Sequence, residues 1–302
     1  MHKASPRILV LKQDRQSRAP AAPPNFYGSM PRETRTHPTT PRWSLAFFSV
    51  IMKSIMATDA RLERERDHYD HSYEHGVVRA ATSKFYDLNG EILRAYDRFL
   101  QLVVPGGSIL DYGCGNGGNV ERLARMKPAK VTGIDISPVA IEQARQRAAR
   151  CGLNAEFSVM DAQNLTFPDE SFDVVLGGAI LHHLELNKAL MTIRRVLKAG
   201  GSAIFIEPLG HNPAINFYRR RTPQMRTEDE HPLLTEDLDL IRHVFPGTSL
   251  RYFNLLTFAT VPVRRFSLAV KAAHACDQAL FRLLPFTRRY AWMVLIIMRK
   301  KR

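Results

Sequence analysis

Short apolar runs alternate with longer amphipathic stretches through the middle of the chain. Five runs have the length and apolar content of buried strands: Ser108–Tyr112, Lys130–Asp135, Ala155–Met160, Phe172–Gly177 and Ser202–Glu207. The stretches with helical spacing are Phe85–Val103, Asn119–Arg125, Val139–Arg150 and Leu190–Leu197. Because strands that alternate with helices form parallel sheets covered on both faces, the pattern predicts an α/β fold.

The C-terminal part of the chain follows a different pattern. Leu250–Thr257 and Ala291–Met298 are predicted strands, and residues 258–290 between them form a helical insertion that mixes apolar and basic positions. Residues 208–249 show the least periodicity, and we expect them to form a lid over a substrate. The triplet Arg219–Arg221 in that lid either binds a carboxylate or phosphate or ends a solvated helix.

The N-terminal part shows no persistent period. Residues 1–42 hold seven of the 18 prolines and are predicted to be disordered, within an extension that spans residues 1–55. The apolar run Trp43–Met52 resembles the core of a signal peptide, and initiation at Met30 would make a secretory leader. The favoured interpretation is initiation near Met52 or Met56, which leaves residues 56–302 as one domain.

Composition changes this picture in two respects. The 302 residues are 45% hydrophobic and 24% charged, which is typical of a globular protein, and no apolar run reaches the roughly 18 residues of a membrane span. The three cysteines have neither a disulfide pattern nor metal-ligand spacing, so we expect a cytoplasmic protein.

The net charge of +14 is unevenly distributed. Residues 1–55 hold nine basic and two acidic side chains, residues 251–302 hold eleven and one, and residues 56–250 hold 23 and 26. The basic character therefore belongs to the two ends and not to the predicted sheet. A non-catalytic nucleic-acid-binding protein that uses these ends remains an alternative, although nucleic acid is not the expected partner.

A glycine-rich loop follows the first predicted strand. Gly113, Gly115 and Gly117 are spaced two apart, and residues without a Cβ let a ligand lie against the backbone. Gly113, Gly115 and Gly118 also satisfy the dinucleotide pattern G-x-G-x-x-G. A nicotinamide-dependent oxidoreductase is therefore an alternative that the glycines alone leave open.

Three successive strands end in aspartate at the edge where ligands of such sheets bind. Asp111 precedes the glycines, where it would repel a pyrophosphate and attract a cation. Asp135 can accept the hydroxyls of a ribose, and Asp161 can accept the exocyclic amine of adenine. Each aspartate taken alone is explained equally well as a helix cap.

With these acids and glycines, the chain resembles the class I S-adenosylmethionine-dependent methyltransferases, most closely their type 11 small-molecule group. The resemblance covers about residues 80–208 and implies a Rossmann-like seven-stranded mixed sheet whose last strand is antiparallel. It also implies S-adenosyl-L-methionine as cofactor, with the ammonium near Asp111 and the methionyl part near the three glycines and Gly177 or Gly178. Asp135 would hold the ribose, Ile136 would pack on adenine, and Asp161 and Ala162 would bind the adenine edge.

Three histidines are candidates for acid–base catalysis. His182 and His183 follow the fourth strand, and His211 follows the fifth strand in the expected lid. The alternatives are a histidine packed at the pocket wall, a solvated one and a hydrogen-bonded loop residue. No metal is expected, because the fourth strand runs into Gly177 and Gly178 and offers no ligands there.

The composition of the segment Val263–Tyr290 is compatible with two environments, a membrane surface and the face of the sheet. Its mixture of leucine, phenylalanine and arginine is compatible with docking on an anionic membrane. The favoured alternative is that it packs on the sheet with its arginines directed outward. The predicted function is methyl transfer to O, N or C of a small or lipid-like acceptor; the sequence indicates no oligomeric state.

Overall fold

The computed structural model describes residues 45–75, 87–222, 227, 230–264 and 266–302. The chain divides into two units after Phe48, and the architecture below is that of residues 49–302. The disorder expected for residues 1–42 and most of the run Trp43–Met52 fall outside this unit. Helix α1 spans Leu45–His75, so residues 45–55 of the expected extension are helical.

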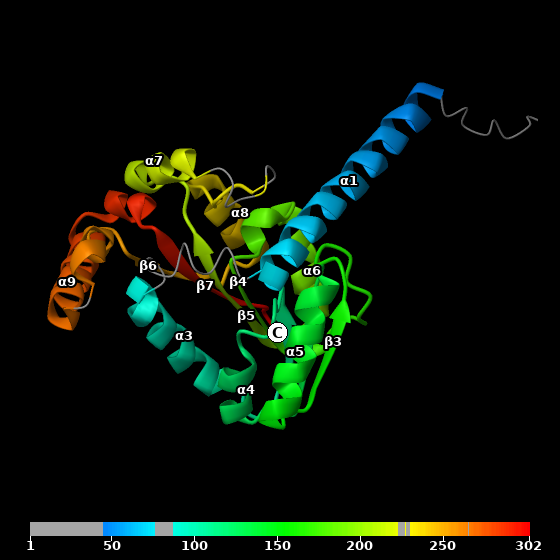
Figure 1. Ribbon diagram of the computed structural model, residues 1–302, viewed down its shortest axis with the longest axis horizontal. Helices are drawn as coiled ribbons and strands as arrows, with labels where there is room; N and C mark the ends of the chain where they lie inside the picture. Colours follow the sequence, from blue (N-terminus) through cyan, green and yellow to red (C-terminus); the bar gives the residue numbers. More distant parts are fainter. Residues whose placement is uncertain (1–44, 76–86, 223–226, 228–229, 265) are drawn as a thin grey trace, which may run out of the picture. The chain divides into compact units, whose positions relative to one another are not determined.

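The described residues contain one seven-stranded sheet with the strand order β3-β2-β1-β4-β5-β7-β6 (Figure 1). Its strands are β1 (Ser108–Tyr112), β2 (Lys130–Asp135), β3 (Ala155–Val159), β4 (Phe172–Gly178), β5 (Leu197–Pro208), β6 (Ser249–Phe253) and β7 (Met293–Arg299). Strands β3, β2, β1, β4 and β5 are parallel, and β7 runs antiparallel to both β5 and β6. The predicted mixed sheet with an antiparallel last strand is confirmed.

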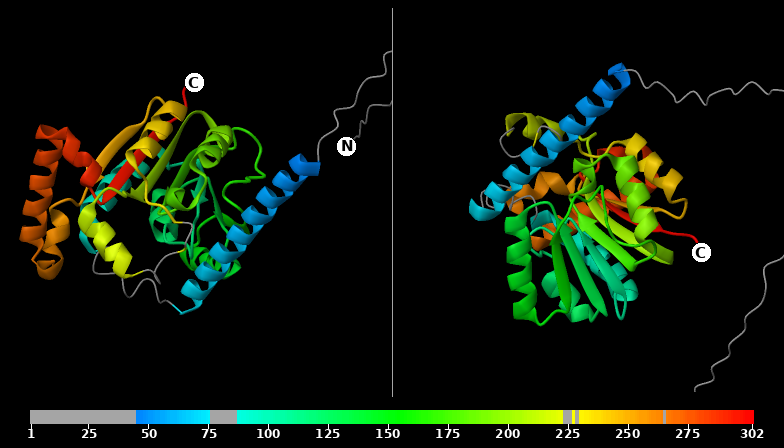
Figure 2. Two further views of the ribbon diagram at one scale, coloured as in Figure 1. Left: turned by 90° about the horizontal axis from the view of Figure 1, so that it is seen from above. Right: turned by 90° about the vertical axis from the view of Figure 1, so that its right-hand side faces the viewer.

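Helices cover both faces of the sheet, as the views in Figure 2 show. The helices of the sheet-forming part are α3 (Gly90–Val103), α4 (Val120–Met126), α5 (Pro138–Cys151), α6 (Leu186–Val196) and α8 (Thr235–Val244). Alternate residues of β1 belong to two different hydrophobic cores. Ile109 lies in the core that contains Leu100 of α3, and Leu110 lies in the core that contains Leu190 of α6. This two-residue period explains why each central strand is a continuous apolar run.

Several element boundaries differ from the sequence prediction for local reasons. The strand expected over Leu250–Thr257 ends at Phe253, because Asn254 adopts a left-handed conformation with φ of 63° and binds Asn89. The helix expected over Leu190–Leu197 begins at Leu186, where the Glu185 side chain accepts a hydrogen bond from the backbone of Lys188. The sequence therefore predicted these elements, but hydrogen bonds and backbone conformation in the flanking turns set where each element begins or ends.

Two helical segments follow the carboxyl ends of β4 and β5: η2 (Leu181–His183) comes after β4 and α7 (Pro213–Arg221) comes after β5. A second kind of segment joins β6 to β7 and contains η4 (Thr257–Val263), α9 (Ser267–Leu283) and η5 (Pro285–Tyr290). This segment is the helical insertion expected for residues 258–290. Among the helices in the described part of the chain, none has both the length and the hydropathy of a membrane span.

Candidate active site

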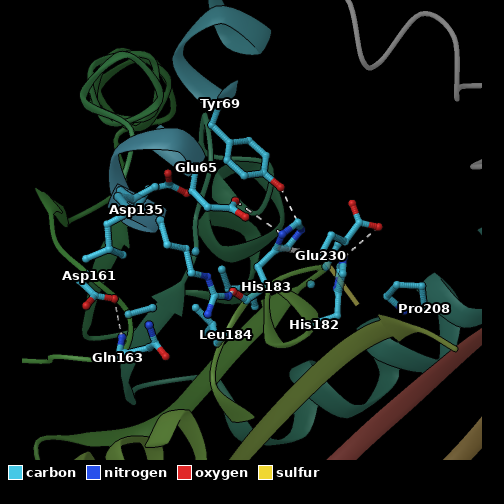
Figure 3. Close-up of a pocket in the computed structure, with 18 of the residues that line it drawn as sticks. Glu65, Tyr69, Asp135, Asp161, Gln163, His182, His183, Leu184, Pro208 and Glu230 are labelled. Atoms are coloured by element: carbon cyan, nitrogen blue, oxygen red, sulfur yellow. Dashed lines mark hydrogen bonds and ion pairs between the residues drawn. The ribbon is translucent and has the colours of Figure 1, made fainter. Parts of the chain in front are cut away.

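A pocket of about 740 Å³ lies at the carboxyl ends of the parallel strands. One end is lined by residues that follow β1, β2 and β3, and the other by α7, η4 and the start of β7. Residues 61–73 of α1 line the pocket from a third side. Figure 3 shows Asp135 and Asp161 toward one end and His182, Glu230 and Pro208 toward the other.

Asp111 is a buried carboxyl group with an incomplete set of partners. Its side chain is 1% exposed, and Oδ1 accepts a 3.0 Å hydrogen bond from Asn119 Nδ2. Oδ2 is buried and has no hydrogen-bond partner. Burial raises the pKa of Asp111 to about 7, against the effect of the Asn119 bond, and the charge of Asp135 adds to the rise. A cation placed beside Oδ2 would satisfy this atom, so the residue fits the ammonium of the expected cofactor.

Gly113, Gly115 and Gly117 in the loop after Asp111 all have positive φ, and the neighbours of Gly113 and Gly117 show that they serve different purposes. Gly113 has φ of 68° and lines the pocket, and a Cβ there would lie 2.8 Å from Ile180 Cγ1. Gly117 has φ of 80°, but a Cβ there would meet Val120 and Ala144, so it serves the packing of α4 against α5. Gly118 has open space around it. The G-x-G-x-x-G alternative depends on Gly118, where the structure shows no need for glycine.

Asp135 lies at the centre of the cofactor end. Its Oδ2 accepts a 2.8 Å hydrogen bond from the backbone of Gly115, and Oδ1 accepts one of 3.0 Å from Ser137. Burial raises the pKa of Asp135 and these backbone donors oppose the rise. Asp135 and Ile136 both line the pocket, while Gly115 connects the glycine loop to the aspartate.

The third aspartate begins the loop after β3. Asp161 Oδ1 accepts a 2.9 Å hydrogen bond from Gln163 N, and Tyr112 donates its hydroxyl to the Ala162 carbonyl at 2.6 Å. Asp161 therefore caps its own turn and also lines the pocket, together with Ala162. The end of β4 supplies Gly178 to the pocket lining. Gly177 faces inward instead, because a Cβ there would lie 2.7 Å from Phe205 Cε1.

His182 and Glu207 form a buried pair at the opposite end of the pocket. Glu207 ends β5, is 0% exposed and accepts backbone hydrogen bonds from Ile180 and Leu181 through Oε1. Its Oε2 lies 2.7 Å from His182 Nδ1. Because the carboxylate accepts, His182 carries its proton on Nδ1 and presents Nε2 as an acceptor. Nε2 lies 3.8 Å from Glu230 Oε1.

His183 is held by α1. Tyr69 lies 2.9 Å from His183 Nε2, and Arg61 donates to the His183 carbonyl. Burial raises the pKa of the Tyr69 phenol, so the hydroxyl stays protonated and can donate to Nε2. Nδ1 then faces Glu65 Oε2 at 3.6 Å. Burial alone would raise the pKa of Glu65, but His183, the Thr227 hydroxyl and Arg61 hold it below its usual value.

His182, His183 and Glu230 lie close enough to hold a metal ion, because one ligand atom from each lies within 4.8 Å of the other two. No metal was expected from the sequence, because the fourth strand runs into Gly177 and Gly178. Glu230 was not considered; it is 47 positions away from His183 and belongs to no motif. Hydrogen bonds to Glu207 and Tyr69 use one nitrogen of each histidine. The other nitrogens and Glu230 are the groups available to a metal.

His211 is a hydrogen-bonded loop residue, which was one of the alternatives stated for it, and the arginine triplet ends helix α7. His211 Nε2 accepts a 3.1 Å hydrogen bond from the backbone of Thr235 at the start of α8, and the residue does not line the pocket. Of the triplet, Arg219 lines the pocket and donates to the Leu209 carbonyl at 3.3 Å. Arg221 lies over the Phe217 ring at 4.2 Å. Part of the expected lid, residues 223–226 and 228–229, lies outside the described residues.

The contribution of α1 to the pocket was missed at the sequence level. Arg61, Glu65, Tyr69 and Tyr73 line the pocket, although they lie in a charged stretch that is typical of a solvent-exposed helix. The contacts that Arg61, Glu65 and Tyr69 make with His183 join residues more than 100 positions apart along the chain. The only available signal was the recurrence of these four residues at intervals of four, which marks one face of a helix.

Comparison with known proteins agrees with this geometry. Residues 109–201 match the sequence model of a family described as a methyltransferase domain. The fatty-acid O-methyltransferase of Mycolicibacterium smegmatis is 38% identical over 109 residues, which cover 35% of this chain and 39% of that protein. The 27-O-demethylrifamycin SV methyltransferase of Amycolatopsis mediterranei is 37% identical over 133 residues, 42% of this chain and 45% of that protein.

A solved structure shows the same fold. Phosphoethanolamine N-methyltransferase 2 of Haemonchus contortus superposes with a TM-score of 0.56 at 19% identity, over 78% of this chain and 60% of that one. For the two curated relatives named before it, the matched segments span less than half of each relative's length.

The strand order with its antiparallel β7, the glycine loop and the three strand-end aspartates define a class I methyltransferase fold. Residues 109–201 match a methyltransferase domain, in agreement with the resemblance that the sequence indicated.

Proposed function

We propose that this protein is an S-adenosylmethionine-dependent methyltransferase that methylates a small or lipid-like acceptor. One observation carries the proposal: a single pocket joins an aspartate-lined cofactor end to a buried histidine–glutamate pair. When bound, S-adenosylmethionine supplies an electrophilic methyl group on a sulfonium. The chain then has to bind this cation, align the acceptor and remove a proton where the acceptor requires it.

We assign the binding of S-adenosylmethionine, a cationic adenosine derivative, to the acidic and backbone groups at the cofactor end of the pocket. Asp111 would bind the ammonium through its unpaired Oδ2, and Asp135 would accept the ribose hydroxyls beside the Gly115 and Ser137 amides. Asp161 and the Ala162 backbone would bind the adenine edge, where both line the pocket. These assignments retain the roles expected from the sequence, apart from Gly117 and Gly177, which serve packing.

The base at the acceptor end is assigned to His182. Glu207 accepts from Nδ1, which holds the ring and stabilises the positive charge that forms when Nε2 takes a proton. A base of this kind serves an acceptor that is protonated before transfer, such as a hydroxyl. His183, held by Tyr69 and facing Glu65, would position the acceptor and not remove its proton.

The acceptor end also carries large apolar side chains, which favour a lipid-like substrate. These are Ile180, Ile215, Phe258, Trp292 and Met293, and they lie in the same lining as the polar Tyr218, Arg219 and Thr222. Burial of apolar surface stabilises binding by roughly 25 cal/mol per Å², so an acyl chain or a terpenoid would gain more here than a sugar would. The two curated relatives described above are named for a fatty acid and for a rifamycin, in agreement with acceptors that have a large apolar part.

A methyl-transfer screen tests the proposal. Protein and radiolabelled S-adenosylmethionine are incubated with cell extract, which is then separated into lipid, small-molecule and macromolecular pools. We expect label in the lipid or small-molecule pool. The Asp135→Asn variant should lose this transfer and the exposed Asp169→Asn variant should retain it. Label confined to nucleic acid would instead identify a nucleic-acid methyltransferase. Absence of label together with salt-dependent binding of nucleic acid would support the non-catalytic alternative, and binding of NAD in place of S-adenosylhomocysteine would support an oxidoreductase.

We propose that the reaction needs no metal and takes place in the cytoplasm, which the three free cysteines favour. If so, full turnover should persist after exhaustive dialysis against EDTA. Loss of turnover that is restored by one divalent metal would instead assign His182, His183 and Glu230 as its ligands.

A further inference from the structure

The segment formed by η4, α9 and η5 exposes large apolar side chains at both ends of α9. Phe266 and Leu268 are 69% and 79% exposed at its start, and Leu283 and Phe286 are 76% and 65% exposed at its end. Large apolar side chains gathered on one surface usually mark an interaction site. We call this surface the α9 face, defined by Phe266, Leu268, Lys271, Arg282, Leu283 and Phe286.

The exposed residues of α9 lie on one side of the helix. Leu268, Ala272, Ala275, Ala279 and Leu283 are all exposed and follow each other at intervals of three or four, which places them on one stripe. The opposite side is fixed by Asp277, which is 0% exposed and accepts backbone hydrogen bonds from Leu255, Leu256 and Thr257. Phe281 packs there against Tyr252 of β6.

The favoured expectation, that the insertion packs on the sheet with its arginines directed outward, describes one side of α9. Helix α9 packs through one side, as expected, but its other side keeps leucines and phenylalanines in contact with solvent. Figure 1 shows α9 at the periphery of the fold beside β6 and away from α5 and α6.

The charge of the α9 face is of one sign. Lys271, Arg282, Arg288 and Arg289 are all exposed, and Asp277 is the single acidic residue between positions 251 and 302. Because Asp277 is fully buried, this surface offers cations and apolar groups without an exposed acid. A phosphate-rich surface with an apolar interior complements both kinds of group.

We propose that the α9 face docks on the surface of an anionic lipid bilayer. The four exposed aromatic and leucine side chains would enter the headgroup boundary, and the lysine and arginines would pair with lipid phosphates. A second copy of the chain fits less well, because two such faces would oppose like charges. The N-terminal 55 residues fit less well for the same reason, with nine basic and two acidic side chains.

Docking would also bring the acceptor end of the pocket near the lipid. Phe258 of η4 and Trp292 after η5 belong to the flanks of this segment, and both line the pocket with their rings 5.8 Å apart. This link between docking and substrate entry rests on the proposed function, whereas docking itself does not.

Vesicle co-sedimentation tests the docking. The full chain is mixed at low salt with vesicles of phosphatidylcholine alone and with vesicles that also contain phosphatidylglycerol. We expect sedimentation with the second kind only, a decrease on addition of salt, and at least about tenfold weaker binding for Leu268→Ser/Leu283→Ser and for Lys271→Gln/Arg282→Gln. The matched control is Leu102→Ser/Arg98→Gln on α3, where Leu102 is 80% exposed.

Three results would overturn the proposal. They are no binding to anionic vesicles, equal binding by the Leu268/Leu283 variant and the α3 control, and a dimer in light scattering that the Leu268/Leu283 variant abolishes. Circular dichroism and a melting curve establish that each variant is folded. Affinity for S-adenosylhomocysteine is measured separately, so that a failure of docking is distinguished from a failure of the methyltransferase proposal.

Discussion

Asp111 is the residue whose ionisation changes near neutral pH. Its pKa is about 7 in the folded chain against 3.8 for an ordinary aspartate, so the folded chain binds more protons between these values. Stability from this group therefore decreases as pH rises from about 4 to about 7. A bound ammonium reverses the trend, because it pairs with the ionised carboxylate.

We therefore expect the affinity for S-adenosylhomocysteine to increase with pH below about 7, by up to about tenfold per unit, and then to level off. The Asp111→Asn variant should bind more weakly and lack this dependence. Isothermal calorimetry at several pH values measures both quantities. A wild-type affinity that is constant between about pH 5 and about 8 would show that Asp111 does not pair with the ligand.

Variants of His182 and Glu207 should distinguish an effect on the chemical step from an effect on cofactor binding. If Nε2 of His182 takes a proton from the acceptor, His182→Gln and Glu207→Gln should lower kcat by roughly 10²–10⁴-fold. Neither variant should change the affinity for S-adenosylhomocysteine by more than a few-fold, because their contacts lie at the acceptor end.

The controls are His243→Gln, an exposed histidine on α8, and His211→Gln, which lies outside the pocket lining. His183→Gln completes the series. Unchanged turnover in the His182, His183 and His211 variants together would refute catalysis by histidine.

At this scale the sequence predicted the groups that end strands. Asp111, Asp135 and Asp161 could be found because each follows an apolar run, and parallel strands bring such ends together. Glu65 and Glu230 could not be found, since each is an ordinary charged residue until a distant histidine lies opposite. Their role depends on pairs separated by tens to more than a hundred residues, which local pattern does not encode.

At the scale of elements, the glycine loop provides a matched comparison. Gly113→Ala forces an L-residue into φ of 68° and brings its Cβ to 2.8 Å from Ile180. We expect a loss of roughly 1–2 kcal/mol from the backbone alone, and weaker ligand binding as Ile180 shifts. The new Cβ of Gly118→Ala would lie in open space, so this variant should keep the stability and the ligand affinity of the wild type. Thermal melting and calorimetry test the pair; equal sensitivity of Gly118 would restore the dinucleotide alternative.

Asp277 should hold the position of α9. It accepts from three backbone amides and from the Thr257 hydroxyl at 2.7 Å, all in the turn that leads from β6 into η4. Asp277→Asn places an amide donor among these donors, and we expect a loss of roughly 1–3 kcal/mol in urea unfolding. The exposed Asp239→Asn on α8 should stay within about 0.5 kcal/mol of the wild type. If Asp277→Asn leaves the free energy of unfolding unchanged, α9 is held by apolar packing instead.

The elements were predicted better than their contacts. Periodicity identified β1 to β5, and the reason is clearest for β1, β2 and β4, whose apolar runs are largely buried. It gave no role to α1, whose polar side chains contact other polar groups of the pocket and therefore leave no apolar stripe in the sequence. It also left α9 ambiguous, since a helix with leucine on both sides is compatible with packing and with docking.

At the scale of the whole molecule, charge separates two binding regions. The segment that supplies the sheet is slightly acidic and directs aspartates at a cationic ligand, while the last 52 residues are strongly basic with their one acid buried. The net charge of +14 thus describes neither region, because half of it comes from residues 1–55 and the rest combines a slightly acidic part with a strongly basic one.

Ligand binding to the acidic region should stabilise the entire folded unit by mass action. At a concentration of S-adenosylhomocysteine about 100 times its Kd, the folded state gains about 2.7 kcal/mol, which for a unit of this size raises Tm by roughly 5–10 °C. NAD at the same concentration should leave Tm unchanged, because its pyrophosphate would face Asp111. The Asp111→Asn variant should show a smaller shift with S-adenosylhomocysteine, and Asp169→Asn should show the wild-type shift. A larger shift with NAD would reassign the glycine loop to a dinucleotide, whatever the outcome of the lipid experiments.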